Sequence, residues 1–94
     1  MPKYVVRVEL RNYATSEQYT QLHAAMEKLG FDRTIFGRGH VKYHLPTAEY
    51  YIVSAYTPEA LTILVSNTAK KIDPECAVLT TEAINFWWDG LKKA

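Results

Sequence analysis

The sequence predicts an α+β fold, a ferredoxin-like βαββαβ sandwich with a four-stranded antiparallel sheet and a short C-terminal helix. Segments rich in β-forming residues alternate with two segments whose apolar residues recur at helical spacing, in the order β, α, β, β, α, β. The chain has 94 residues, 48% of them hydrophobic, which suits a single domain over residues 1–94. In such a fold both helices pack on one face of the sheet, and the other face stays open.

The first half of the chain contains two predicted strands and one helix. Residues 4–10 (YVVRVEL) alternate between apolar and more polar side chains, the pattern of a half-buried strand. Thr15 and Gln18 resemble a capping box, and the apolar stripe that follows predicts a helix that ends at Gly30. Residues 33–38 (RTIFGR) predict a second strand, in which glycine indicates a bulge or an early end.

The second half repeats the pattern and adds a tail. Residues 50–56 (YYIVSAY) predict a central strand, and Thr57 with Pro58 predicts the start of a helix that Asp73 stops before a proline. Residues 77–80 (AVLT) predict a short fourth strand. Apolar side chains at positions i, i+3, i+4 and i+7 then predict an amphipathic C-terminal helix: Ile84, Trp87, Trp88 and Leu91.

Composition narrows the compartment and the partners. The formal net charge of +1 gives no strong overall field, so a nucleic acid would need a local basic patch. Cys76 is the only cysteine and cannot form an internal disulfide. No apolar run approaches the ~20 residues that span a bilayer, and the strand pattern starts at once without a secretory signal. We therefore expect a soluble cytoplasmic protein that folds alone or as a homodimer and does not bind membranes.

One stretch of the chain concentrates positive charge. Residues 33–48 contain no acidic residue, while cations and histidines alternate there with aromatic rings. Cations meet phosphates and rings stack on unpaired bases, so the stretch predicts a site for single-stranded RNA. The alternative is a solvated loop whose cations balance acids elsewhere. The candidate RNA-binding residues are Arg33, Arg38, Lys42 and Tyr43, with Arg7 from the first strand.

Three histidines are candidates for proton transfer. His40 and His44 can act as base and acid near neutral pH when a ribose 2′-hydroxyl attacks its phosphate, with Arg38 or Lys42 stabilising the transition state. The alternative is that they only hydrogen-bond or pack in the hairpin. His23 follows an apolar helix position, so it is either a boundary residue or a functional one. No cofactor is expected, and no metal site, because the spacing of His40 and His44 joins ligands only in a helix.

Other conspicuous residues have structural interpretations. Arg7 and Glu9 project onto the open face, where they form a solvated cross-strand ion pair or contact a dimer partner or ligand. Trp87 and Trp88 are expected to cap the open face or a dimer seam, with base stacking as the alternative. Cys76 is expected to be a small core residue.

Several short segments together resemble the GhoS family of small endoribonucleases. They are Tyr4-Val5-Val6, Leu22 with Met26, Gly30-Phe31, the Leu45 loop before a Tyr-rich strand, and Leu79-Thr80-Thr81-Glu82 with aromatics after it. The resemblance implies a ferredoxin-like fold related to CRISPR-associated nucleases, and a type V antitoxin that cuts the messenger of a membrane toxin. It also implies a catalytic basic residue on the first helix, which His23 matches in position, although the family has arginine there.

Two functions follow as hypotheses. The first is a metal-independent endoribonuclease or RNA-binding protein, with His23, His40 or His44 handling protons. The second is a non-enzymatic dimeric module that binds a protein or a small ligand. Cations that gather without acidic partners would favour the first, and cations that each meet a carboxylate would favour the second.

Overall fold

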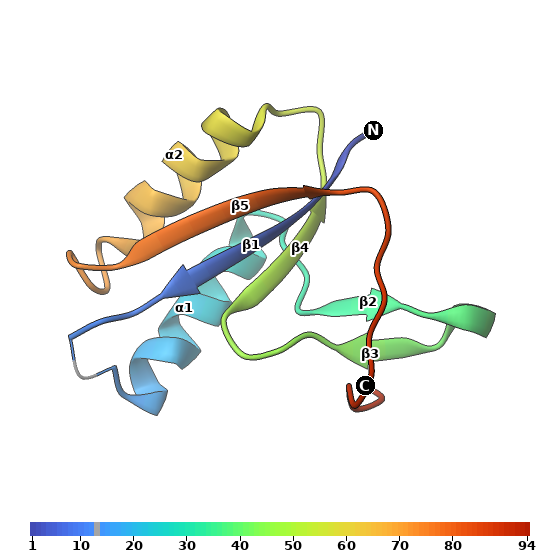
Figure 1. Ribbon diagram of the computed structural model, residues 1–94. Coiled ribbons are helices and arrows are strands. Elements are labelled where there is room, and N and C mark those ends of the chain that lie inside the picture. Colours follow the sequence, from blue (N-terminus) through green and yellow to red (C-terminus); the bar gives the residue numbers. More distant parts are fainter. Residues whose placement is uncertain (13) are drawn as a thin grey trace.

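Three antiparallel strands and two helices form the body of the molecule. The computed structural model describes residues 1–12 and 14–94. Its central sheet has the order β4-β1-β5 and consists of β1 (Lys3–Glu9), β4 (Glu49–Val53) and β5 (Ala77–Ala83). Both helices, α1 (Ser16–Lys28) and α2 (Pro58–Ala69), cover one face of this sheet (Figure 1). The mixed α+β class with one open sheet face is therefore confirmed.

Alternation along β1 divides the sheet into a core face and an open face. Tyr4, Val6 and Val8 are almost fully buried, whereas the residues between them are exposed or half-buried. The buried side chains pack against apolar residues of both helices and of β4: Leu22, Met26, Leu61, Val65 and Tyr50. Burial of this apolar surface supplies the main driving force for folding.

Both helices begin at the predicted caps. Thr15 Oγ1 accepts a hydrogen bond from the Gln18 amide (3.1 Å), and Gln18 Oε1 accepts one from the Thr15 amide (3.0 Å). Thr57 Oγ1 accepts from the Ala60 amide (3.1 Å). These bonds satisfy amides that have no partner within the helix, so the local sequence fixes where each helix starts.

The predicted four-stranded sheet is wrong, because the chain leaves the sheet edge after a single bridge. The amides of Asp32 and Tyr51 each donate to the other's carbonyl (2.8 Å both ways), and the pairing stops there. β2 (Thr34–Phe36) then pairs with β3 (Lys42–His44) in a separate two-stranded sheet. Residues 34–36 therefore belong to a second sheet and do not continue the pairing with β4.

A tight turn closes the hairpin. The 3₁₀ turn η1 (Arg38–His40) contains Gly39 and His40, both with left-handed backbone conformations (φ 69° and 58°). Left-handed residues reverse the chain within a few residues. The reversal ends β2 at Phe36, two residues before the predicted end of the strand.

The predicted C-terminal helix is also wrong. Residues 84–94 contain no helix. The His44 amide donates to the Lys92 carbonyl (2.8 Å), and the Ala94 amide donates to the Lys42 carbonyl (3.0 Å), so this segment lies against β3. β5 runs on to Ala83, so Thr80 and Thr81, the residues before the segment that are suited to cap a helix, lie in the strand. A helix of two turns without a cap has marginal stability, so the segment pairs with β3 instead.

Of the helices in the described residues, none is long and apolar enough to cross a bilayer.

Candidate functional site

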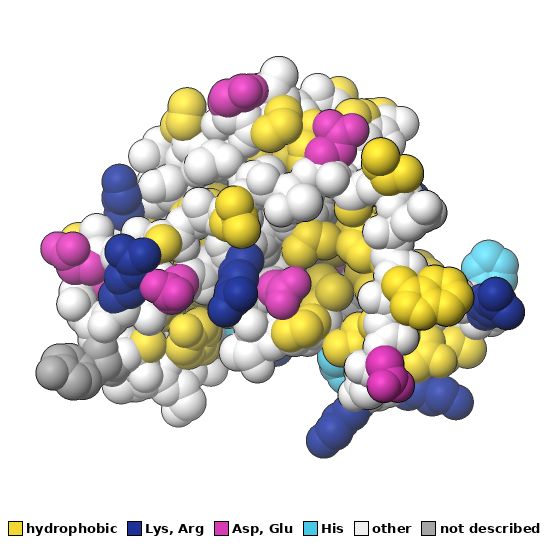
Figure 2. All heavy atoms as spheres, in the orientation of Figure 1, with side chains coloured by type: hydrophobic (Ala, Val, Ile, Leu, Met, Phe, Trp, Pro, Cys, Tyr) yellow, Lys and Arg dark blue, Asp and Glu magenta, His cyan; other side chains and the backbone are white. Residues whose placement is uncertain are grey.

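The hairpin and the C-terminal segment together project from the body of the molecule. We call β2, η1, β3 and residues 84–94 the arm. Figure 1 shows the hairpin extending to one side of the central sheet, with the red C-terminal segment running across it. In Figure 2, large hydrophobic side chains gather on the arm, with Lys, Arg and His side chains around them. The arm therefore combines the two kinds of side chain that the acid-free stretch predicts.

In the part of the chain that the structure describes, the cations of residues 33–42 have no acidic partner. Arg33, Arg38 and Lys42 are exposed. Within residues 1–12 and 14–94, the one ion pair joins Arg11 Nε to Glu9 Oε1 (2.7 Å), away from the hairpin. Lys42 Nζ instead lies 5.4 Å from the centroid of the Phe36 ring, in a cation–π contact. These positive charges are available to an anion from outside the chain.

Aromatic rings from both parts of the arm surround a wide hollow of about 580 Å³. The Trp87 side chain is 92% exposed and Phe36 is 61% exposed. Tyr43 and Trp88 pack on each other with ring centroids 5.4 Å apart. The side chains around the hollow are Phe36, Arg38, Tyr43, Phe86, Trp87 and Trp88.

A narrower hollow of about 240 Å³ shares Phe36 and Phe86 with the wide one. It lies where the arm meets the open face of the sheet, because Phe86 packs edge-on against Tyr51 of β4 with ring centroids 5.6 Å apart. Polar and charged side chains make up much of its wall: Lys3, Asp32, Thr34, Lys42 and Tyr51.

The two tryptophans have different environments. Trp88 packs against the hairpin through Tyr43, whereas almost the whole of Trp87 faces solvent. Phe86 is the residue of this segment that contacts the open sheet face, through Tyr51, and a place at a dimer seam stays a prediction for the two tryptophans. Sequence reasoning missed Phe86 because the helical spacing of its neighbours left it outside the apolar stripe.

His23 lies on α1, beside the core. Its Nδ1 and the hydroxyl of Tyr50 share a hydrogen bond of 2.7 Å. Partial burial, together with the positive charge of Arg33, lowers the pKa of His23 below its ordinary value. His23 is therefore neutral at pH 7 and able to accept a proton, with a guanidinium nearby.

The other two histidines are on the arm. His40 is exposed at the hairpin turn, with its ring centroid 6.4 Å from that of Phe36. His44 is exposed and pairs with Thr34 across the hairpin. Within the described part of the chain, no hydrogen bond or ring contact joins either of them to His23. Arg33 is the predicted RNA-binding residue whose charge acts on His23.

Arg7 lies on the open face of the sheet, away from the arm's cluster of rings. It stands opposite Glu49 of β4 and Leu79 of β5. Glu9 pairs with Arg11, its near neighbour in the sequence, so the expected cross-strand ion pair is not formed. Figure 2, which looks onto this face, shows charges of both signs across it.

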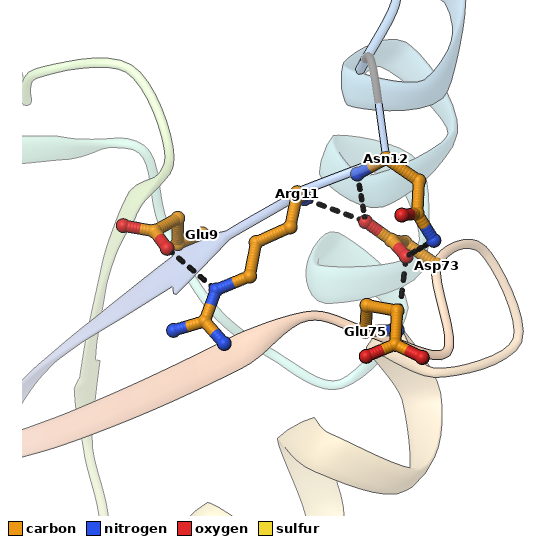
Figure 3. Close-up of polar contacts among 5 residues, drawn as sticks. All are labelled: Glu9, Arg11, Asn12, Asp73 and Glu75. Atoms are coloured by element: carbon orange, nitrogen blue, oxygen red, sulfur yellow. Dashed lines mark hydrogen bonds and ion pairs between the residues drawn. The ribbon is translucent and has the colours of Figure 1, made fainter.

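A buried carboxylate, which the sequence predicts only as the end of the second helix, joins the end of β1 to the end of α2. Asp73 Oδ2 accepts from the amides of Arg11 and Asn12 (2.6 and 3.1 Å), and Asp73 Oδ1 accepts from Asn12 Nδ2 and the Glu75 amide (both 2.9 Å) (Figure 3). The hydrogen bonds from Arg11 and then Asn12 hold the pKa of Asp73 below its ordinary value. Three of these four bonds come from backbone amides and fix the local backbone, so Asp73 is a structural residue.

Cys76 is half-buried, and burial raises the pKa of its thiol. It packs against the core, as the sequence predicts for a small apolar side chain. In the described residues, no group of three or more His, Cys, Asp or Glu side chains is placed to hold a metal ion.

Comparison with known proteins finds no family model, no curated protein and no solved structure that matches this chain. The resemblance to the GhoS family stays a prediction, and the functional argument rests on the arm and on His23.

Proposed function

We propose that this protein binds single-stranded RNA through the arm. The observation that carries the proposal is that Arg38 and Lys42, which have no acidic partner among the described residues, lie beside exposed aromatic rings. A strand of RNA offers phosphates to such cations and unstacked bases to such rings. The β1-α1-β4-α2-β5 order, with Asp32 paired to Tyr51 at the sheet edge, supports a ferredoxin-like fold in which the fourth strand is reduced to one bridge. The proposal keeps the cytoplasm as the compartment, where messenger RNA is present.

The test is RNA binding with matched charge variants. The double variant Arg38→Ala, Lys42→Ala removes two cations that would neutralise phosphates. Its plot of log affinity against log salt should be less steep by roughly 0.7 for each phosphate that is no longer neutralised. The control is Lys70→Ala, Lys71→Ala, which removes the same charge from exposed positions at the end of α2. Equal loss of affinity in both variants would show only an effect of net charge and would count against the arm.

RNA cleavage is a second proposal, supported by the position of His23 beside a guanidinium and a buried tyrosine. The ribose 2′-oxygen attacks the adjacent phosphorus, its proton passes to Nε2 of neutral His23, and Arg33 stabilises the negative charge that develops. The 5′-oxygen leaves with a proton from His40 or His44. The products are a 2′,3′-cyclic phosphate and a 5′-hydroxyl, as expected for a GhoS-like antitoxin that cuts without a metal.

The cleavage proposal is tested on unstructured RNA in EDTA. We expect cleavage by the unchanged protein and at least a roughly 100-fold slower reaction for His23→Gln, which is within the usual contribution of a general base. His40→Ala and His44→Ala, made singly, should identify the acid. Full activity in all three variants would exclude this mechanism, while RNA binding can still hold.

A dimeric module without enzymatic activity is the alternative, and the open sheet face supports it. Leu79 is 64% exposed and Val53 is 45% exposed on this face. Exposed apolar groups on a sheet favour contact with a second copy. Sedimentation of the unchanged protein and of Leu79→Lys distinguishes the dimeric module from the RNA-binding protein. The dimeric module requires a dimer that dissociates in Leu79→Lys, and it requires no affinity for RNA at low salt.

A further inference from the structure

The two hollows of the arm differ in the chemistry of their walls and touch along two shared rings. We infer that together they bind one unstacked nucleotide of a single strand, with the base in the wide hollow and the adjoining phosphate in the narrow one. This inference rests on the proposed function and specifies which part of the RNA the arm recognises.

The wide hollow has the size and the walls for a base. Its volume of about 580 Å³ lies within the range of pockets that hold small ligands. Trp87 and Phe36 present large ring surfaces to solvent, since they are 92% and 61% exposed. Trp88 is held in place by Tyr43 at 5.4 Å. Stacking on such rings accepts any base, because every base has a flat π-surface.

The narrow hollow suits a phosphate. Lys3 of β1 and Lys42 of β3 approach it from the sheet and from the hairpin, and Tyr51 and Thr34 contribute hydroxyl groups. Asp32 is the one carboxylate on its wall, so cations outnumber acids there. Its volume of about 240 Å³ is less than half that of the wide hollow, as the smaller of the two groups requires.

Lys42 connects the two sites. Its ammonium group lies 5.4 Å from the Phe36 ring centroid, and Phe36 belongs to both walls. A phosphate at the lysines therefore lies next to a base on the rings, which is the arrangement within one nucleotide. An apolar protein segment in the wide hollow would instead bury the charge of Arg38, which has no acidic partner here, and burial of an unpaired charge is costly.

The test separates base recognition from backbone recognition with two oligomers of equal charge. One is a short single strand of uridines, and the other is the same ribose-phosphate chain without bases. We expect the unchanged protein to bind the uridine strand at least about fivefold more tightly, the lower limit for one stacked base. Trp87→Ala should lose this preference and keep its affinity for the chain without bases. Tryptophan fluorescence should be quenched by the uridine strand alone.

The control for Trp87→Ala is Tyr56→Ala, since Tyr56 is also an exposed aromatic residue (57%) but lies outside both hollows. Tyr56→Ala should keep the preference for the uridine strand over the chain without bases. Trp87 is almost fully exposed, so Trp87→Ala should unfold at the same temperature as the unchanged protein. Lys3→Ala should weaken both oligomers alike by several fold, whereas Lys71→Ala, which lies outside both hollows, should not.

The outcomes distinguish this inference from the function on which it rests. Equal affinity of the unchanged protein for the two oligomers would overturn the base site and leave RNA binding through the backbone intact. No effect of Lys3→Ala would overturn the phosphate site. Absence of binding to either oligomer at low salt would instead remove the proposed function itself.

Discussion

His23 illustrates how partial burial sets the charge of a side chain. Half-buried on α1 and hydrogen-bonded to Tyr50, it favours the neutral form more than an exposed histidine does, and the nearby charge of Arg33 acts in the same direction. In the unfolded chain both influences vanish. The unfolded state therefore binds a proton more readily than the folded state.

This difference predicts a pH dependence of stability. Because the folded pKa lies below the ordinary value of 6.5, stability is fully present above about pH 6.5 and declines as the unfolded state takes up its proton at lower pH. Urea unfolding should show a lower free energy of unfolding at about pH 5.5 than at about pH 7.5, and this decrease should be smaller in His23→Gln than in the unchanged protein. The exposed His40 provides the control, since His40→Gln should keep the full dependence. An unchanged dependence in His23→Gln would contradict the assignment.

The hydrogen bonds of Asp73 predict that its substitution lowers the stability of the protein. In Asp73→Asn one acceptor oxygen becomes an amide group that donates. In one orientation this group faces the amides of Arg11 and Asn12, and in the other it replaces the oxygen that accepts the hydrogen bond from Glu75. We expect the melting temperature at pH 7 to fall by several degrees, and the difference to shrink in acid, where the carboxylate of the parent protein also loses its charge. Asp89→Asn, at an exposed position, should melt with the parent protein.

At the scale of single elements, helix starts are the most local feature of this fold. The capping box at Thr15 involves only Thr15 and Gln18, three residues apart. We expect Thr15→Ala to lower the free energy of unfolding by about 1 kcal/mol, measured by urea titration. Thr20→Ala, inside the same helix and exposed, should change it by less than ~0.5 kcal/mol. Equal losses in the two variants would show that the cap has no special role.

Elements that depend on distant partners were less predictable. The spacing of Ile84, Trp87, Trp88 and Leu91 fits a helix, but the same bulky residues also suit an extended chain, and local pattern does not decide between the two. The decision comes from β3, which lies far earlier in the chain and forms hydrogen bonds with the segment. Gly90, with φ 85°, is moreover in the left-handed region, which ends a helix.

At the scale of the whole molecule, the order of β1, α1, β2, β4, α2 and β5 was predictable, whereas β3, where the sequence predicts no strand, and the division into two sheets were not. Both helices and β1 appear where their patterns indicate, but β4 ends at Val53 and lies at the edge of its sheet instead of the centre, and β5 runs on to Ala83. Residues 33–38 have equally good β-forming composition, yet which edge they pair with depends on the turn at Gly39 and His40. The acid-free stretch indicated the cationic part of the site, whereas the contribution of residues 84–94 required the three-dimensional arrangement.

The packing within the arm predicts that a substitution in the hairpin loosens the C-terminal segment. A Cβ at Gly37 would lie 2.8 Å from Tyr43 Cε2 and 3.0 Å from Trp88 Cζ2, so Gly37→Ala must displace one of these rings. We expect faster digestion of residues 84–94 by a carboxypeptidase, while far-UV circular dichroism shows the helices unchanged. Trp87→Ala is the control because its side chain is almost fully exposed. Unchanged digestion of Gly37→Ala would show that the hairpin does not hold the segment.

The C-terminal segment that pairs with β3 also affects the association of this chain with other copies of itself. β3 has β2 on one side, and hydrogen bonds to Lys92 and from Ala94 occupy its other side. A strand with a bare edge is a template on which another chain can add a strand, and folded proteins cover or blunt such edges. Loss of the last few residues would therefore uncover an aggregation-prone edge, flanked by the exposed rings of the same arm.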